Sequence, residues 1–154
     1  MTTTRLTQRL AASPSRVYRA LTDARDVAKW MVPAGMTSEV HEFEPRVGGA
    51  FRISLTYEGP EAMCKTSAHV DTYHGRFIDL VPNERVIQVM EFETADASMG
   101  GEMTVTFMLS EADHGTDLVA VHENVPPGVS PADNETGWRM SLEKLATLLE
   151  RESA

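Results

Sequence analysis

Apolar and polar residues alternate at the start of the chain, and the spacing then becomes helical. The alternation predicts a strand over residues 3–10. Ser13 offers an N-cap hydroxyl and Pro14 suits the first helical position, so we expect a helix to begin here. The pair Thr22-Asp23 can cap a second short helix over residues 24–31, which stops before the next proline.

Six segments with a period of two follow. In the clearest of them, Phe51, Ile53 and Leu55 alternate with polar residues, which predicts a strand with one apolar and one polar face. The predicted strands cover residues 37–44, 51–57, 70–80, 85–93, 102–109 and 116–124. Because the connections between them are mostly short, the run is typical of an antiparallel meander.

The last part of the chain carries the strongest helical pattern. Ser130 and Pro131 provide an N-cap and a first helical residue, and Asp133 places an acid near the positive end of the helix dipole. A mainly apolar stripe follows, formed by Trp138, Ser141, Leu142, Leu145, Leu148 and Leu149. The apolar face of the meander is the surface large enough to bury this stripe, so we expect the helix to pack there.

The lengths of the connections indicate where a binding site would open. Alternate connections of a meander lie at the same end of the sheet. The short ones are 45–49, 81–84 and 110–115, and the long ones are 58–68, 94–101 and 125–130. We therefore expect the long loops and the start of the last helix to surround the mouth of a cavity.

Composition and charge narrow the class of protein. A chain of 154 residues with 42% hydrophobic residues predicts a single soluble domain over residues 1–154. The 14 Lys and Arg are scattered and outnumbered by 23 Asp and Glu, for a net charge of -9. This balance argues against binding to nucleic acid or to anionic membrane surfaces. We also expect no membrane insertion, because no apolar run approaches the length that a bilayer requires.

Cys64 is the one cysteine of the chain, so no intrachain disulfide can form. The residues after Met1 contain no apolar signal core, and a reducing cytoplasm is therefore the default location. A catalytic thiol needs a positioned base, whereas Cys64 lies between Met63 and Lys65 in a predicted loop. We expect this cysteine to be unreactive.

The order of strand, two short helices, six strands and long helix resembles the helix-grip fold of the START-like (SRPBCC) superfamily. Four segments carry the resemblance: residues 12–23 with Trp30, the glycine-rich hairpin at 48–52, the strand turn at 75–86, and Gly137-Trp138 with Leu142 and Leu145. The most similar subgroup is the one named after the C-terminal domain of the activator of the 90-kilodalton heat-shock protein ATPase. The resemblance implies an α+β fold, in which one N-terminal strand and a six-stranded meander form a curved antiparallel sheet around the C-terminal helix.

The same resemblance implies several functions. Members of the superfamily bind lipids, sterols, polyketides or hormones between sheet and helix, and some catalyse cyclisation, dehydration or hydrolysis there. The co-chaperone that the subgroup resembles has a separate N-terminal domain, for which we expect no room in this chain. Our first expectation is the binding of a small, largely apolar molecule, lipid-like or aromatic, by a monomer or homodimer without a cofactor. A cyclase or hydrolase using the same cavity and a protein-interaction, chaperone-assisting module remain the alternatives.

The expected cavity wall consists of inward-alternating strand residues and of residues on the helices beside the sheet. The candidate ligand-binding residues are Trp30, Phe51, Ile53, Tyr73, Phe77, Met90, Phe92, Met103, Phe107, His122, Trp138 and Leu142. For any single one of them, packing in the core is the more frequent role. Together, and with nine methionines in the chain, they favour an adaptable cavity of roughly 300 to 1,000 Å³.

His122 is the main polar candidate. It shares a strand face with Leu118 and Ala120, so it should point between sheet and helix, where a neutral imidazole can donate to or accept from a ligand. A core histidine bonded to protein or to water is an equally open interpretation. In an enzyme of the cyclase or hydrolase kind, His122 would be the general acid or base.

The remaining polar residues identify no reaction. The five histidines, His41, His69, His74, His114 and His122, show no metal-ligand spacing, so we expect no metal site. By alternation Glu39, His41 and Asp79 fall on inward positions, although a register offset of one residue would turn them outward. Glu135 and Arg139 could reach the mouth from the last helix. No serine-histidine-aspartate order, phosphate loop or dinucleotide motif is present, and we assign no catalytic residue.

Overall fold

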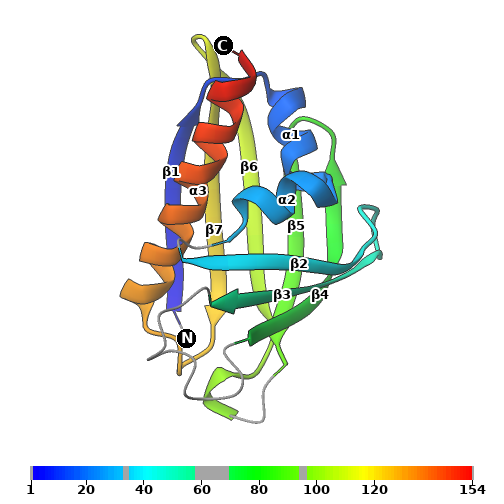
Figure 1. Ribbon diagram of the computed structural model, residues 1–154, viewed down its shortest axis with the longest axis vertical. Helices are drawn as coiled ribbons and strands as arrows, with labels where there is room; N and C mark the ends of the chain where they lie inside the picture. Colours follow the sequence, from blue (N-terminus) through cyan, green and yellow to red (C-terminus); the bar gives the residue numbers. More distant parts are fainter. Residues whose placement is uncertain (1, 33–34, 58–69, 94–96, 154) are drawn as a thin grey trace.

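The computed structural model describes residues 2–32, 35–57, 70–93 and 97–153, and within these ranges seven antiparallel strands form one curved sheet (Figure 1). The strands are β1 (Thr2–Leu10), β2 (Met36–Phe43), β3 (Ala50–Tyr57), β4 (Val70–Val81), β5 (Arg85–Phe92), β6 (Met103–Ala112) and β7 (Gly115–Val125). The helices are α1 (Pro14–Thr22), α2 (Ala24–Trp30), the short 3-10 helix η2 (Ala97–Met99) and α3 (Pro131–Ser153). The sheet order β1-β7-β6-β5-β4-β3-β2 is that of a meander with β1 added beside β7. The predicted α+β helix-grip architecture is confirmed.

Capping residues begin the two short helices where the sequence places them. The Ser13 hydroxyl accepts a hydrogen bond from the backbone nitrogen of Arg16 at 3.3 Å. The Asp23 carboxylate accepts from the nitrogens of Arg25 and Asp26 at 2.8 and 3.1 Å. These bonds satisfy backbone donors that the first turn of a helix leaves unpaired. The indole nitrogen of Trp30 then donates to the carbonyl oxygen of Ala20 at 2.8 Å, which joins the end of α2 to α1.

Two of the three register shifts in the described strands lie in the part of the sheet that bends around the helix. One lies between Val40 and Glu42 in β2, and the other lies between Phe77 and Asp79 in β4. A bulge adds a residue to one strand and increases its local twist, so the alternation of faces changes there. Strands β2, β3 and β4 consequently turn away from the direction of β5, β6 and β7 (Figure 1).

The same shifts correct the predicted direction of three polar residues. Glu39 pairs with Ser54, and Asp79 pairs with Ile87, both on the outer face of the sheet. His41 is the extra residue of the β2 bulge and shares a hydrogen bond of 2.7 Å with the Ser54 hydroxyl. Glu39, His41 and Asp79 therefore face outward, and the inward positions suggested by simple alternation are wrong.

Helix α3 packs on the concave face of the sheet through its apolar stripe. Leu142, Leu145 and Leu149 are at most 1% exposed, and Ser141 is also buried. Trp138 and Leu148 are half-buried and pack against the same core. The predicted stripe is confirmed, and its burial fixes α3 against β1 and α2 (Figure 1).

One end of the sheet carries the start of α3 and two of the long connections. The backbone nitrogen of Gly128 donates to the carbonyl oxygen of Ser98 at 2.6 Å, so the β5–β6 and β7–α3 connections lie side by side. The space is tight, because a Cβ at Gly128 would lie 2.6 Å from the Ser98 hydroxyl oxygen. The third long connection, 58–68, lies outside the described residues, as do Cys64 and His69. The helices within the described ranges are too short or too polar to cross a membrane.

Candidate ligand-binding pocket

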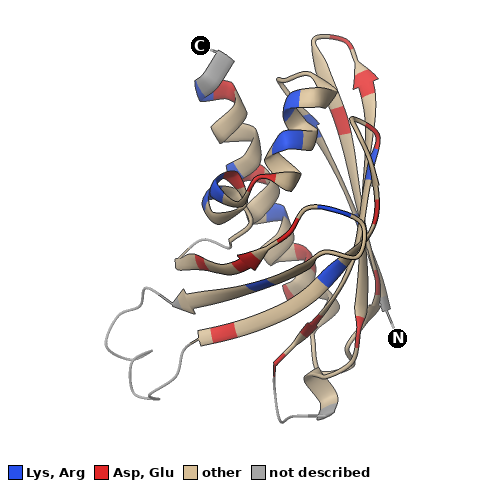
Figure 2. Ribbon diagram, turned by 90° about the vertical axis from the view of Figure 1, so that its right-hand side faces the viewer, with Lys and Arg blue, Asp and Glu red and all other residues tan. Residues whose placement is uncertain are grey.

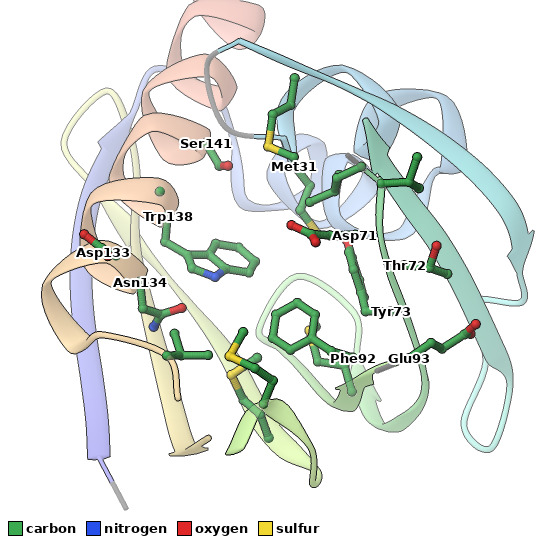
Figure 3. A pocket seen from close by; sticks show the side chains of 18 residues that line it. Met31, Asp71, Thr72, Tyr73, Phe92, Glu93, Asp133, Asn134, Trp138 and Ser141 are labelled. Carbon is green, nitrogen blue, oxygen red and sulfur yellow. The ribbon is translucent and has the colours of Figure 1, made fainter. Parts of the chain in front are cut away.

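A pocket of about 470 Å³ lies between the sheet and the first half of α3 (Figure 3). It opens at the end of the sheet that carries η2 and the start of α3. Its lining residues are Met31, Met36, Leu55, Val70, Asp71, Thr72, Tyr73, Met90, Phe92, Glu93, Met99, Met103, Val129, Asp133, Asn134, Gly137, Trp138 and Ser141. Aromatic rings and methionines make up much of this wall, which suits an apolar ligand of variable shape.

The structure divides the candidate ligand-binding residues into two groups. Tyr73, Met90, Phe92, Met103 and Trp138 line the pocket. The others are buried outside its wall, at most 2% exposed: Trp30, Phe51, Ile53, Phe77, Phe107, His122 and Leu142. His122 is buried although it lies near the end of β7 that leads to α3, so position along the sheet does not alone decide which residues line the pocket.

Ring contacts show how the buried group closes the pocket from behind. Phe107 contacts Trp30 on one side and Trp138 on the other, with ring centroids 6.3 and 6.0 Å apart. Phe51 packs against Phe77 at 5.4 Å and against Tyr73 at 6.3 Å. Phe107 and Phe51 therefore support the lining rings of Trp138 and Tyr73, and Trp30 and Phe77 pack behind them.

His122 lies behind Trp138 and does not line the pocket. The side-chain nitrogen of Asn134 donates to His122 Nδ1 at 3.1 Å and to the Thr4 hydroxyl at 3.2 Å. The proton of the imidazole is then on Nε2, which is buried and has no hydrogen-bond partner among the described residues. Burial lowers the pKa of His122 from 6.5 to about 4, so the ring is neutral at physiological pH.

Tyr73 supplies a hydroxyl at the inner wall. Its oxygen lies 3.9 Å from the sulfur of Met31, to which it donates a weak hydrogen bond. Burial raises the pKa of the Tyr73 phenol, which therefore stays protonated. The ring meets that of Phe92 edge-on, with centroids 6.4 Å apart. Because a thioether is a poor acceptor, the hydroxyl can turn to a ligand at little cost.

The charged residues of the lining are acidic. They are Asp71, Glu93 and Asp133, and the described lining contains no Lys, Arg or His. Glu93 is held on the outside by Arg52, whose nitrogens donate at 2.8 and 3.0 Å. This pairing, together with His74, lowers the pKa of Glu93 to about 2. In Figure 3 the side chain of Glu93 points away from the pocket, whereas that of Asp71 points into it.

Sequence reasoning missed several lining residues that its own patterns could have found. Asp71 lies two positions before Tyr73 and therefore on the same strand face. Asn134 lies four positions before Trp138, on the same side of the helix. Met31 follows α2 and Val129 precedes α3, where no strand or helix period applies, so only the tertiary structure brings them to the pocket.

The described residues form no group of three or more His, Cys, Asp and Glu side chains that could hold a metal ion. Lys and Arg occur on both helices and strands (Figure 2). Glu135 and Arg139, which the sequence placed near the mouth, are exposed on α3 and lie 3.4 Å apart. Neither lines the pocket.

The fold and the pocket define a helix-grip protein of the START-like class. The chain matches the family model described as Activator of Hsp90 ATPase homolog 1-like protein over residues 11–150, and it belongs to this family. The resemblance stated from the sequence is thereby confirmed.

Solved structures from several bacteria share the fold. A protein from Chromobacterium violaceum is 35% identical, with 96% of each chain covered and a TM-score of 0.86. A protein from Rhodobacter sphaeroides is 25% identical over 97% of this chain and 93% of its own, with a TM-score of 0.80. An AHSA1 protein from Silicibacter pomeroyi, 19% identical over 98% and 99% of the two chains, supports the fold alone with a TM-score of 0.80. No curated protein matches the chain.

Proposed function

We propose that this protein binds a small, largely apolar molecule in the pocket between the sheet and α3. The observation that carries the proposal is an open space of about 470 Å³ inside an otherwise well-packed fold. Its volume falls within the range of small-molecule sites. The rings and methionines of its wall form a concave apolar surface, so a ligand that covers them removes apolar surface from water.

The composition of the wall supports the same proposal. Trp138, Phe92 and Tyr73 offer ring surfaces, and Met31, Met36, Met90, Met99 and Met103 offer unbranched side chains that adapt to different shapes. The indole nitrogen of Trp138 has no hydrogen-bond acceptor among the described residues. It therefore provides a donor that can orient a polar group of the ligand.

Two measurements test this function. Native mass spectrometry of the protein purified from its own host should detect a retained small molecule. Calorimetric titration of the unliganded protein with the neutral probe 2-(1-naphthyl)ethanol should show saturable binding.

A matched pair of variants tests whether the probe binds in the pocket. Ser141 lines the pocket and is buried, whereas Ser110 is exposed at the far end of β6. Ser141→Phe fills the space and should weaken probe binding at least about tenfold, whereas Ser110→Phe should leave it unchanged. Melting curves establish that both variants fold. Equal binding by the two variants would place the probe elsewhere and remove the support for this function.

The description of the family favours a second candidate, a chaperone-related role. It names an activator of the Hsp90 ATPase. The test is the ATPase rate of the host's Hsp90-type chaperone, measured with and without an equimolar amount of this protein. Stimulation that survives Ser141→Phe would favour this second role over ligand binding.

An enzymatic role in the same pocket has less support from the geometry. The general acid or base considered from the sequence, His122, is separated from the pocket by Trp138. We also propose a cytoplasmic location and a monomeric or homodimeric state. The proposed location rests on the single cysteine of the chain, and cell fractionation tests it. Native mass measurement tests the oligomeric state.

A further inference from the structure

The electrostatic character of the pocket restricts the chemical class of its ligand. Among the described lining residues three are acidic and none is basic. The whole chain carries a net charge of -9, so the surrounding potential has the same sign. A ligand with a carboxylate would enter against this potential, whereas a ligand with a positive charge would be attracted.

Unlike three acids on nearby parts of the sheet and its connections, Asp71 has no compensating partner among the described residues. Asp79 is paired with Arg85 at 2.7 Å, Glu93 with Arg52 at 2.8 Å, and Glu102 with Arg76 at 3.0 Å. By contrast, the Asp71 carboxylate has no ion pair or hydrogen bond with any residue that the structure describes. It extends from the inner face of β4 into the pocket, on the same face as Tyr73 (Figure 3).

Aromatic rings face the same space as this carboxylate. Figure 3 shows the indole of Trp138, the ring of Phe92 and the carboxylate of Asp71 directed toward one another across the pocket. The face of an aromatic ring is the negative part of its quadrupole, so it attracts a cation placed within about 6 Å of its centre. A carboxylate and ring faces around one apolar space are complementary to a positive charge on an apolar body.

We propose that the ligand of this pocket is an organic cation, an amine whose charged group lies between Asp71 and the rings of Trp138 and Phe92. Its apolar body packs against the methionines of the inner wall. This inference rests on the proposed function and names the ligand class of the same site. It predicts discrimination by charge among molecules of equal size and shape.

Three probes of similar size and different charge test the inference: 2-(1-naphthyl)ethylamine, 2-(1-naphthyl)ethanol and 1-naphthylacetate. Calorimetric titration at about pH 7 and low salt should show the amine binding at least about fivefold more tightly than the alcohol, and the carboxylate most weakly. Raising the NaCl concentration from about 20 mM to about 500 mM should reduce the preference for the amine, because salt screens an exposed carboxylate.

Two variants with the same change in net charge locate the effect. Asp71→Asn removes the carboxylate of the pocket, whereas Asp113→Asn removes one from the β6–β7 turn at the opposite end of the sheet (Figure 1). Asp71→Asn should lower the preference for the amine to less than about twofold, and Asp113→Asn should keep it. Melting curves of both variants establish that they are folded.

The outcomes separate this inference from the function on which it rests. Equal binding of amine and alcohol overturns the cation assignment and leaves apolar ligand binding standing. A preference for the amine that survives Asp71→Asn overturns the role of Asp71. Failure of all three probes to bind overturns both the inference and the proposed function.

Discussion

Trp138 covers His122. Their ring centroids lie 4.5 Å apart and their planes meet at 71°, in an edge-to-face arrangement. Trp138 lines the pocket, whereas His122 is fully buried behind it. The main polar candidate from the sequence, His122, therefore supports the pocket wall from behind and does not contact the pocket itself.

The neutral state of His122 should make folding stability depend on pH. Its pKa is lowered from 6.5 to about 4, so the unfolded chain binds a proton here more readily than the folded one. The contribution of His122 to the free energy of unfolding is therefore complete above pH 6.5 and is lost as the pH falls through 4. The loss is roughly 3 kcal/mol at most. Urea melts across this range measure the slope. His122→Gln should flatten it, whereas His114→Asn, in an exposed turn, should not.

Asn134 should contribute more to the free energy of unfolding than the exposed first turn of α3 around it suggests. Its amide nitrogen donates hydrogen bonds to His122 and to Thr4, and both of these polar residues are buried. Asn134→Leu leaves both unpaired and should cost about 1 to 3 kcal/mol. Thr136→Ala, exposed on the same helix, should change stability by less than about 0.5 kcal/mol. Equal denaturation midpoints for the two variants would mean that the amide contributes nothing.

The docking of α3 can be tested on its stripe. Leu145 is fully buried, so Leu145→Ala should destabilise the protein by about 2 to 5 kcal/mol through lost burial and a residual cavity. Glu143 faces solvent on the opposite side, and Glu143→Ala should stay within about 0.5 kcal/mol. Chemical denaturation of both variants measures the difference. Similar shifts would contradict the observed packing of the helix.

The fold could be predicted because its signals are local. Ser13, Asp23 and Ser130 begin helices at the predicted positions, and alternation within each strand identifies its buried face. Alternation fails at a bulge, because an extra residue changes the face without leaving a sequence mark. For this reason Glu39, His41 and Asp79 face outward, which is the second of the two directions that the sequence leaves open.

The pocket could be predicted only in part, because core and cavity residues share one pattern. Phe77 and Phe92 both lie on inward positions of neighbouring strands, yet Phe77 is 1% exposed in the core and Phe92 lines the pocket. Their difference depends on where α3 begins and how far its side chains reach along the sheet. This is a tertiary property, and no spacing in the sequence encodes it.

The ion pair on the outer face should affect stability at the acid end of the pH range. Hydrogen bonding to Arg52 lowers the pKa of Glu93 from 4.5 to about 2. The folded state therefore gains from Glu93 above pH 4.5, and this gain is lost as the pH falls through 2. Glu93→Gln should reduce the acid sensitivity of thermal melting between these values. Because the pair is accessible to solvent, high salt should diminish the effect in the unmodified protein.

The ring of Trp138 should protect His122 from chemical modification. Diethyl pyrocarbonate acylates the unprotonated nitrogen of a neutral imidazole that the reagent can reach, and His122 is fully buried, with Nδ1 accepting a hydrogen bond from Asn134. In the unmodified protein His122 should resist acylation, while exposed His114 should react. Trp138→Ala removes the ring that lies between the His122 imidazole and the pocket, so His122 should become reactive, with the rate measured by peptide mass mapping. Trp138→Phe keeps a ring at the position and should preserve most of the protection. If His122 reacts at the same rate in all three proteins, Trp138 does not cover it in solution, and an acid-base role for the imidazole in the pocket would regain its geometric basis.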